Sequence, residues 1–276
     1  MHRFLDAAGT AHRPTESGAR IVCLVPSITE LLFDLGLGDR VVGRTGFCIH
    51  PRDLVKPVPK VGGTKDVDIA KIRDLAPTHL IVTIDENRKP AVASLAEFIP
   101  NVVVTHPLAP LDNLPLYRLL GGIFGCGQRA EDLCGEFQAA YDAAVSACAR
   151  LPRERVLYLI WKNPWMTVSR DTYISRTLAA VGWDTLEIEG TDRYPKLELT
   201  PALLSGVDKV LLSSEPYAFR KKHVKELEML CVPFAVRRSP ITVSPVDGEM
   251  TSWYGSRAIE GIDYLRGLRF SKSTAG

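Results

Sequence analysis

Short apolar runs and helix-like segments alternate along almost the whole chain, and this alternation restricts the possible folds more than any other feature. Residues 20–25, Arg-Ile-Val-Cys-Leu-Val, are rich in β-branched residues and almost continuously apolar, which predicts a short buried strand. A helical pattern begins directly after this run. Further strands are expected over 79–84, 102–105, 156–161 and 209–213. Strands that alternate with helices in this way predict parallel sheets covered by helices.

One longer amphipathic stretch interrupts the alternation near the middle of the chain. From Gln128 to about Leu151, apolar residues recur at spacings of three and four, which predicts a single helix of roughly 35 Å at 1.5 Å per residue. The expected fold class is therefore α/β, with two lobes joined by one long helix, each lobe a mostly parallel sheet flanked by helices. The expected parts are an N-terminal extension over 1–19, a lobe over 20–127, the helix over 128–151 and a second lobe over 152–276.

Composition and charge exclude several partners. The 276 residues carry a net charge of +2 with scattered Lys and Arg, so no nucleic-acid partner is expected. No apolar run approaches the roughly 20 residues that span a bilayer, so the chain is not expected to insert into a membrane. The polar N-terminus lacks a secretory signal, and the six cysteines form no CxxC pair. These features predict a cytoplasmic location, with the periplasm as the alternative if a leader precedes this sequence.

Sequence patterns of common enzymes are absent. The chain contains no GxSxG elbow, no GxxxxGK[ST] loop and no HExxH pair. We therefore expect a binding protein with no catalytic residues and no catalytic cofactor.

The candidate ligand-binding residues of the first half lie in turns and loops, and those that follow residues 20–25 and 79–84 lie at the sheet edge where open α/β sheets bind ligands. They are Pro26, Ser27, Thr29, Phe47, Cys48, His50, Lys65, Glu86 and Asn87. Ser27 and Glu30 have capping-box spacing, so Ser27 is the expected N-cap of the first helix. Cys48 and His50 could line the pocket, could pack within their loop, or could contact a transition metal, with His50 the metal candidate. Glu86 and Asn87 either form a solvated turn or hydrogen-bond a ligand.

Aromatic residues mark the candidates of the second half. Trp165 and Trp253-Tyr254 fall in loop or cap positions, where a flat apolar ligand could rest on them, whereas Trp161 at a strand end suits the core. The candidates are Trp165, Arg170, Tyr194, Glu249, Trp253 and Tyr254. Their mixed charges favour an uncharged or zwitterionic ligand.

Several motifs together resemble a known family. They are the Arg20–Leu31 segment RIVCLVPSITEL, Val61-Gly62-Gly63-Thr64, the Asp74–Val82 segment DLAPTHLIV, and the long helix. In this combination they are similar to the helical-backbone (cluster A-II, or class III) substrate-binding proteins, which include cobalamin- and ferric-siderophore-binding components of ABC importers. The segments FCIHP (47–51), WKNPW (161–165) and DGEMTSWY (247–254) resemble the cobalamin-binding branch.

The resemblance implies a metal chelate held in a cleft between the lobes. We expect a cobalamin-like corrinoid, bound by a receptor or carrier. A haem or ferric-siderophore binder is the alternative, and a cytoplasmic tetrapyrrole-processing enzyme is the second. In the family's cobalamin importers each lobe offers a glutamate to arginines of the permease. The matching positions here are Ala70 and about Pro201, neither of them acidic, although Glu198 is near the second. We therefore do not expect docking to an ABC permease.

Overall fold

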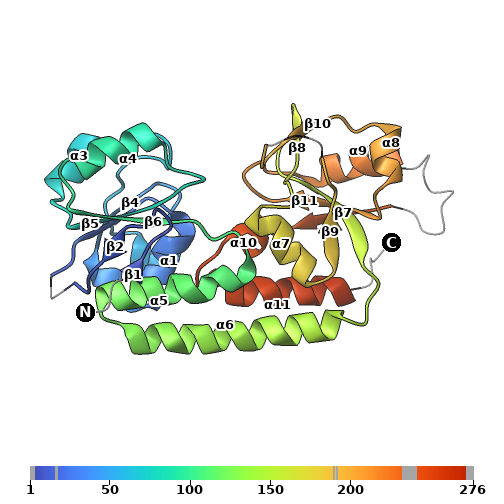
Figure 1. Ribbon diagram of the computed structural model, residues 1–276. Coiled ribbons are helices and arrows are strands. Elements are labelled where there is room, and N and C mark those ends of the chain that lie inside the picture. Colours follow the sequence, from blue (N-terminus) through green and yellow to red (C-terminus); the bar gives the residue numbers. More distant parts are fainter. Residues whose placement is uncertain (1–3, 16–17, 189, 191, 232–240, 272–276) are drawn as a thin grey trace. The chain divides into compact units, whose positions relative to one another are not determined.

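The computed structural model describes residues 4–15, 18–188, 190, 192–231 and 241–271, and it divides into two compact units (Figure 1). Unit 1 comprises Met1–Pro107, Leu111–Phe137 and Tyr254–Arg257. Unit 2 comprises Leu108–Pro110, Gln138–Trp253 and Ala258–Gly276. Each unit contains one parallel sheet with helices on both faces, so the predicted fold class is confirmed.

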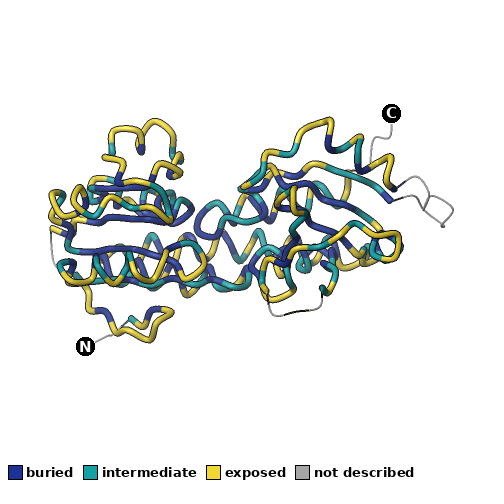
Figure 2. Tube along the Cα trace, turned by 90° about the horizontal axis from the view of Figure 1, so that it is seen from above, coloured by how far each residue is buried: buried dark blue, intermediate teal, exposed yellow. Residues whose placement is uncertain are grey.

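The sheet of unit 1 has four parallel strands in the order β4-β3-β5-β6. Their bounds are β4 Val41–Arg44, β3 Ile21–Cys23, β5 His79–Thr83 and β6 Asn101–Thr105. Helices α3 (Ile69–Asp74) and α4 (Lys89–Ala96) cover one face through a core that includes Val22, Leu80 and Leu95. Helices α1 (Pro26–Asp34) and α5 (Asn113–Phe124) cover the other (Figure 1). The central strands β3 and β5 are buried along their whole length (Figure 2), which explains why their sequences are almost continuously apolar.

A short hairpin covers the edge strand β6 of unit 1. It consists of β1 (Phe4–Leu5) and β2 (Ala11–His12). Between them, Ala7 N donates to Val104 O at 2.9 Å and the Asp6 carboxylate accepts from Val104 N at 3.0 Å. The described residues of the N-terminal stretch therefore protect a sheet edge that would otherwise be open to pairing.

The sheet of unit 2 has four parallel strands in the order β12-β11-β7-β9. Their bounds are β12 Thr242–Val246, β11 Lys209–Ser213, β7 Glu154–Leu159 and β9 Trp183–Thr185. Alternate residues of β7 enter different cores: Val156 and Tyr158 pack with α7 (Tyr173–Ala180) and α11 (Arg257–Phe270). Leu157 and Leu159 pack with α8 (Pro201–Ser205) and α9 (Lys221–Cys231).

The predicted long helix is α6, Gly127–Cys148, with a buried stripe that includes Leu133, Phe137, Ala144 and Cys148. The remaining elements are short. They are η1 Gly38–Arg40, α2 Arg52–Val55, η2 Pro110–Asp112, β8 Trp165–Met166, β10 Lys196–Leu197 and α10 Gly248–Ser252.

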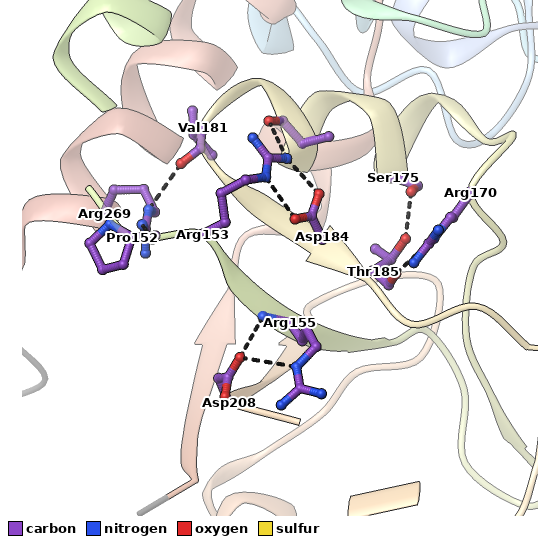
Figure 3. A network of polar contacts seen from close by, with 11 residues as sticks. Pro152, Arg153, Arg155, Arg170, Ser175, Val181, Asp184, Thr185, Asp208 and Arg269 are labelled. Carbon is purple, nitrogen blue, oxygen red and sulfur yellow. Dashed lines mark hydrogen bonds and ion pairs between the residues drawn. The ribbon is translucent and has the colours of Figure 1, made fainter. Parts of the chain in front are cut away.

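The amino-terminal edge of the unit 2 sheet is held by ion pairs and hydrogen bonds (Figure 3). Arg153 Nε donates to Asp184 Oδ2 at 2.7 Å, and Arg155 N donates to Asp208 Oδ2 at 2.7 Å. These contacts fix the starts of β7, β9 and β11 relative to one another.

The last two described helices, α10 and α11, are separated by a short return of the chain into unit 1. Gly255 lies in this return with a φ of +87°, and a Cβ there would lie 3.1 Å from the Ser27 carbonyl oxygen. Its N–H donates to Asn113 Oδ1 at 2.7 Å, and its carbonyl accepts from the Tyr117 hydroxyl at 2.9 Å. Glycine suits both the left-handed backbone and the close approach.

Candidate functional site

The first strand-to-helix turn of unit 1 differs from the sequence prediction. Val25 is the N-cap of α1 and no side chain caps it, so the predicted N-cap at Ser27 is wrong. Pro26 occupies the first turn, where its missing N–H removes no helical hydrogen bond. Ser27 and Thr29 are both buried, and the Thr29 hydroxyl donates to Val25 O at 2.9 Å.

The loop after β4 buries Cys48 and exposes its neighbours. Thr29 Oγ1 donates to Cys48 Sγ at 3.1 Å, and Thr45 Oγ1 lies 3.2 Å from the same sulfur. Burial raises the pKa of the Cys48 thiol, which keeps it neutral and a poor metal ligand. Phe47 is 61% exposed and His50 is half-buried.

In the part of the chain that the structure describes, no set of side chains is arranged to bind a resident metal ion. No group of three or more His, Cys, Asp or Glu side chains there could hold one. A metal contact by His50 would thus be to the metal of a bound chelate, and it stays a prediction.

Asn87 connects two loops at the carboxyl edge of the unit 1 sheet. Its Oδ1 accepts from Thr83 N at 2.9 Å, and its Nδ2 donates to Thr64 O at 2.9 Å. Both ends of the amide are therefore occupied by backbone, and the side chain is 8% exposed. Lys65 is exposed beside Thr64, and Glu86 is half-buried. A ligand contact by Lys65, Glu86 or Asn87 stays a prediction.

Tyr254 belongs to unit 1, although its neighbour Trp253 belongs to unit 2. The Tyr254 ring is buried, and burial together with the charge of Glu86 raises the pKa of its hydroxyl. The two aromatic residues that the sequence places side by side thus serve different units.

Trp165 is part of an aromatic cluster at the carboxyl edge of the unit 2 sheet. Its indole stacks on Phe219, with ring centroids 6.1 Å apart and planes 3° from parallel. Tyr217 contacts Phe219 at 4.7 Å and Trp161 at 5.4 Å between centroids. Trp161 is 39% exposed, so it does not lie in the core as its position at a strand end suggested.

Trp253 is held by a carboxylate that the sequence analysis missed. Its Nε1 donates to Glu215 Oε1 at 2.9 Å, and Ser252 Oγ lies 3.2 Å from the same oxygen. Burial raises the pKa of Glu215, and the nearby carboxylates of Glu249 and Asp247 raise it further. Glu215 follows β11 as Glu86 follows β5, so the argument that selected Glu86 could also have found it.

The two remaining candidates lie near β9 or at the surface. Arg170 is exposed, donates to Thr185 O at 3.3 Å (Figure 3), and forms an ion pair with Glu187 at 3.1 Å. Tyr194 is 37% exposed, and the Arg193 guanidinium lies 5.9 Å from its ring centroid.

A pocket of about 330 Å³ lies elsewhere, at the amino-terminal edge of the unit 1 sheet. It is lined by Ala11, His12, Arg13, Pro14, Thr15, His79 and Asn101. None of the candidate residues lines it.

Each α/β unit has a parallel sheet, and aromatic and polar side chains gather at the carboxyl edge of each sheet. These features are typical of a substrate-binding protein. The chain belongs to the periplasmic binding protein family, whose model matches residues 21–200. It is 37% identical over 264 residues to the uncharacterized ABC transporter substrate-binding lipoprotein YvrC of Bacillus subtilis (strain 168). That match covers 89% of this chain and 78% of the relative.

Solved structures share the fold. The periplasmic vitamin B12 binding protein BtuF of Vibrio cholerae matches with a TM-score of 0.76 and 16% identity, over 91% of this chain and 98% of that one. The periplasmic heme-binding protein RhuT from Roseiflexus sp. RS-1 matches with a TM-score of 0.74 and 22% identity, over 92% and 98%. The predicted membership among substrate-binding proteins of this type is confirmed.

The predicted cytoplasmic location is wrong. The family is one of periplasmic proteins, and the Bacillus relative is a lipoprotein, which together indicate an extracytoplasmic location. The unpatterned cysteines misled the prediction, because all six are free and five are buried. Burial makes a thiol inert, so such residues do not require a reducing compartment.

No helix among the described residues is long and apolar enough to cross a bilayer. Ala70 is exposed in α3 and Pro201 is the exposed first residue of α8, so neither of these surface positions carries a carboxylate. The expectation that the chain does not dock an ABC permease stays a prediction.

Proposed function

We propose that this chain is a ligand receptor or carrier of the periplasmic binding protein type, that it binds a cobalamin-like corrinoid, and that it catalyses no reaction. The observation that carries the proposal is the aromatic surface at the carboxyl edges of both sheets. Phe47 is exposed in unit 1, and Trp165 and Trp253 are part-exposed in unit 2. Flat apolar ligands rest well on such rings. The fold's similarity to a vitamin B12 binding protein supports the same ligand class.

Charge at the unit 2 edge favours an uncharged or zwitterionic chelate over a carboxylate-rich siderophore. Arg170 pairs with Glu187 at 3.1 Å, and the Lys162 ammonium pairs with Glu226. A polyanionic ligand would have to compete with these carboxylates for each cation. The amide groups that fringe a corrin ring need only hydrogen-bonding partners, and half-buried Glu86 is suited to that role.

Calorimetric titration tests the ligand class. Cobalamin and cobinamide should bind with a dissociation constant at or below the micromolar range, about −8 kcal/mol or stronger. Haem and a ferric siderophore serve as competing ligands in parallel titrations. Heat from haem or the siderophore alone would contradict the corrinoid and leave the receptor function intact.

Haem is the second candidate, and the structural similarity to a heme-binding protein favours it. The aromatic cluster of Trp161, Trp165, Tyr217 and Phe219 would suit a porphyrin as well as a corrin. The absorption spectrum of the protein purified from its native host separates the two, because a corrinoid and a haem absorb at different wavelengths.

A further inference from the structure

Arg44, the last residue of β4, carries a buried charge whose hydrogen bonds all go to backbone carbonyls. The side chain is 4% exposed in total. Its guanidinium donates to the carbonyl oxygens of Val55 at 2.9 Å, Cys48 at 3.0 Å, Thr45 at 3.2 Å and Lys56 at 3.4 Å. Among the described residues no carboxylate forms an ion pair with it. A buried charge is tolerated only when its N–H groups are hydrogen-bonded. The carbonyls must therefore stay in place for Arg44 to remain buried, and Arg44 in turn holds them in place.

The four carbonyls all belong to residues 45–56, which we call the Arg44 loop. A second anchor lies inside this loop, where Cys48 is buried against Thr29 and Thr45. A third joins it to the next loop, where Gly46 N donates to Gly62 O at 2.8 Å. The fork of an arginine can reach several carbonyls at once, because its five N–H groups are fixed in one plane.

These anchors determine which side chains the Arg44 loop exposes. On either side of buried Cys48, Phe47 is 61% exposed and Ile49 is 45% exposed. Because the Arg44 loop is fixed by these anchors, its exposed apolar side chains form a contact surface before any ligand binds. Preorganisation of this kind strengthens binding, because the loop loses little conformational freedom when the ligand arrives.

We infer that Arg44 is a positioning residue of the ligand site, which holds the Arg44 loop so that Phe47 and Ile49 face the ligand before it binds. The inference rests on the proposed function. Arg44 itself does not need to touch the ligand, and its effect on affinity passes through the loop.

Substitution of Arg44, with a matched control, tests the inference on the full chain. Arg44→Met removes all four hydrogen bonds, and Arg44→Lys keeps the charge but loses the fork. Arg20→Met is the control, because Arg20 also donates to backbone carbonyls, those of Leu75 and Ala76, but at the amino edge of the same sheet. We expect cobalamin affinity to fall about 10- to 100-fold in Arg44→Met and less in Arg44→Lys, and to be unchanged in Arg20→Met.

Hydrogen exchange and a double-mutant cycle distinguish positioning from general destabilisation. Amides of residues 45–56 should exchange faster in free Arg44→Lys than in the wild type and regain protection with cobalamin bound. In the cycle, Phe47→Ala should cost less affinity in the Arg44→Lys background than in the wild type, because the two residues act on one contact.

Three results would overturn the inference. They are equal cobalamin affinity in wild type and both Arg44 variants, an equal loss in Arg20→Met, and strict additivity with Phe47→Ala. If Arg44→Met does not fold, Arg44→Lys alone decides between these outcomes. A wild-type chain that binds neither cobalamin nor haem would instead contradict the proposed function, and the inference would fall with it.

Discussion

His79 is the first residue of β5, and its imidazole is neutral in the folded protein. Burial and, as the smaller cause, the charge of nearby His12 together lower the pKa of His79 from 6.5 to about 4. Between these two values the unfolded chain binds a proton at this residue and the folded chain does not. Protonation therefore favours unfolding as the pH falls through this window.

The consequence is measurable as a loss of stability in acid. The free energy of unfolding should fall by about 3 kcal/mol between pH 6.5 and pH 4 from His79 alone. His79→Gln should remove this part of the pH dependence, as followed by urea unfolding at several pH values. Parallel profiles for the variant and the wild type would show that His79 does not titrate in this way.

Trp165 and Trp253 should each contribute to ligand affinity. Truncation of either to Ala should weaken cobalamin binding by about 1–3 kcal/mol, the usual cost of removing a buried aromatic contact. Met229→Ala in α9 is the comparison, because that side chain is exposed and lies outside the aromatic cluster. Normal binding by both folded variants would mean that the two rings only pack within the protein.

At the scale of elements, runs with a clear period were predictable and short edge strands were not. β11 matches its predicted range of 209–213, and α6 begins one residue before its predicted start at Gln128. The strand β4 was not predicted because Gly43 interrupts its apolar pattern. A Cβ at Gly43 would lie 2.9 Å from Leu75 and 3.1 Å from Val22, a packing demand that no local pattern reveals. The strand β12 was not predicted because it contains Pro245, and proline argues against a strand in a sequence pattern although an edge strand tolerates it.

Among the residues of the candidate site, too, some could be located from the sequence and others could not. Loops that follow strong strands could be located, so Glu86 was found, whereas Phe47 was found through the resemblance of the FCIHP segment to the cobalamin-binding branch. Arg44 was missed because it ends β4, a strand that the sequence pattern did not reveal, and because its partners are backbone carbonyls, for which residue type gives no signal. Tyr254 could not be assigned to unit 1 from the sequence, because its separation from Trp253 depends on the return of the chain at Gly255.

The hairpin of β1 and β2 depends on one carboxylate. Asp6 accepts hydrogen bonds from two amides of the hairpin, from His12 Nε2 at 3.0 Å and from Val104 N at 3.0 Å. Asp6→Ala should lower the free energy of unfolding by about 3 kcal/mol, because it leaves buried donors unpaired. Urea unfolding measures this, with Asp74→Ala, an exposed aspartate at the end of α3, as control. Equal effects of the two substitutions would contradict an anchoring role.

At the scale of the whole molecule, unit 1 draws on three stretches of chain. Its last stretch, Tyr254–Arg257, is joined to α5 by the hydrogen bonds of Asn113 and Tyr117 with Gly255. Asn113→Ala should destabilise the protein by about 2 kcal/mol and Tyr117→Phe by about 1 kcal/mol, since each leaves a buried backbone group of Gly255 unpaired. Thermal unfolding checks both, and the exposed Tyr194→Phe should have no effect. Unchanged unfolding in Asn113→Ala would show that the return segment adds little stability.

The return of Tyr254–Arg257 into unit 1 also sets the order in which the protein can be completed. A chain that leaves the ribosome, or crosses a membrane, with its N-terminus first delivers most of unit 1 early. Until Gly255 follows, the side-chain oxygen of Asn113 and the hydroxyl of Tyr117 lack the partners that the finished fold gives them. Almost all of unit 2 emerges in the meantime. A partly delivered chain would therefore hold unit 1 without these two hydrogen bonds, and unit 1 would reach its full stability only after residues 254–257 have followed.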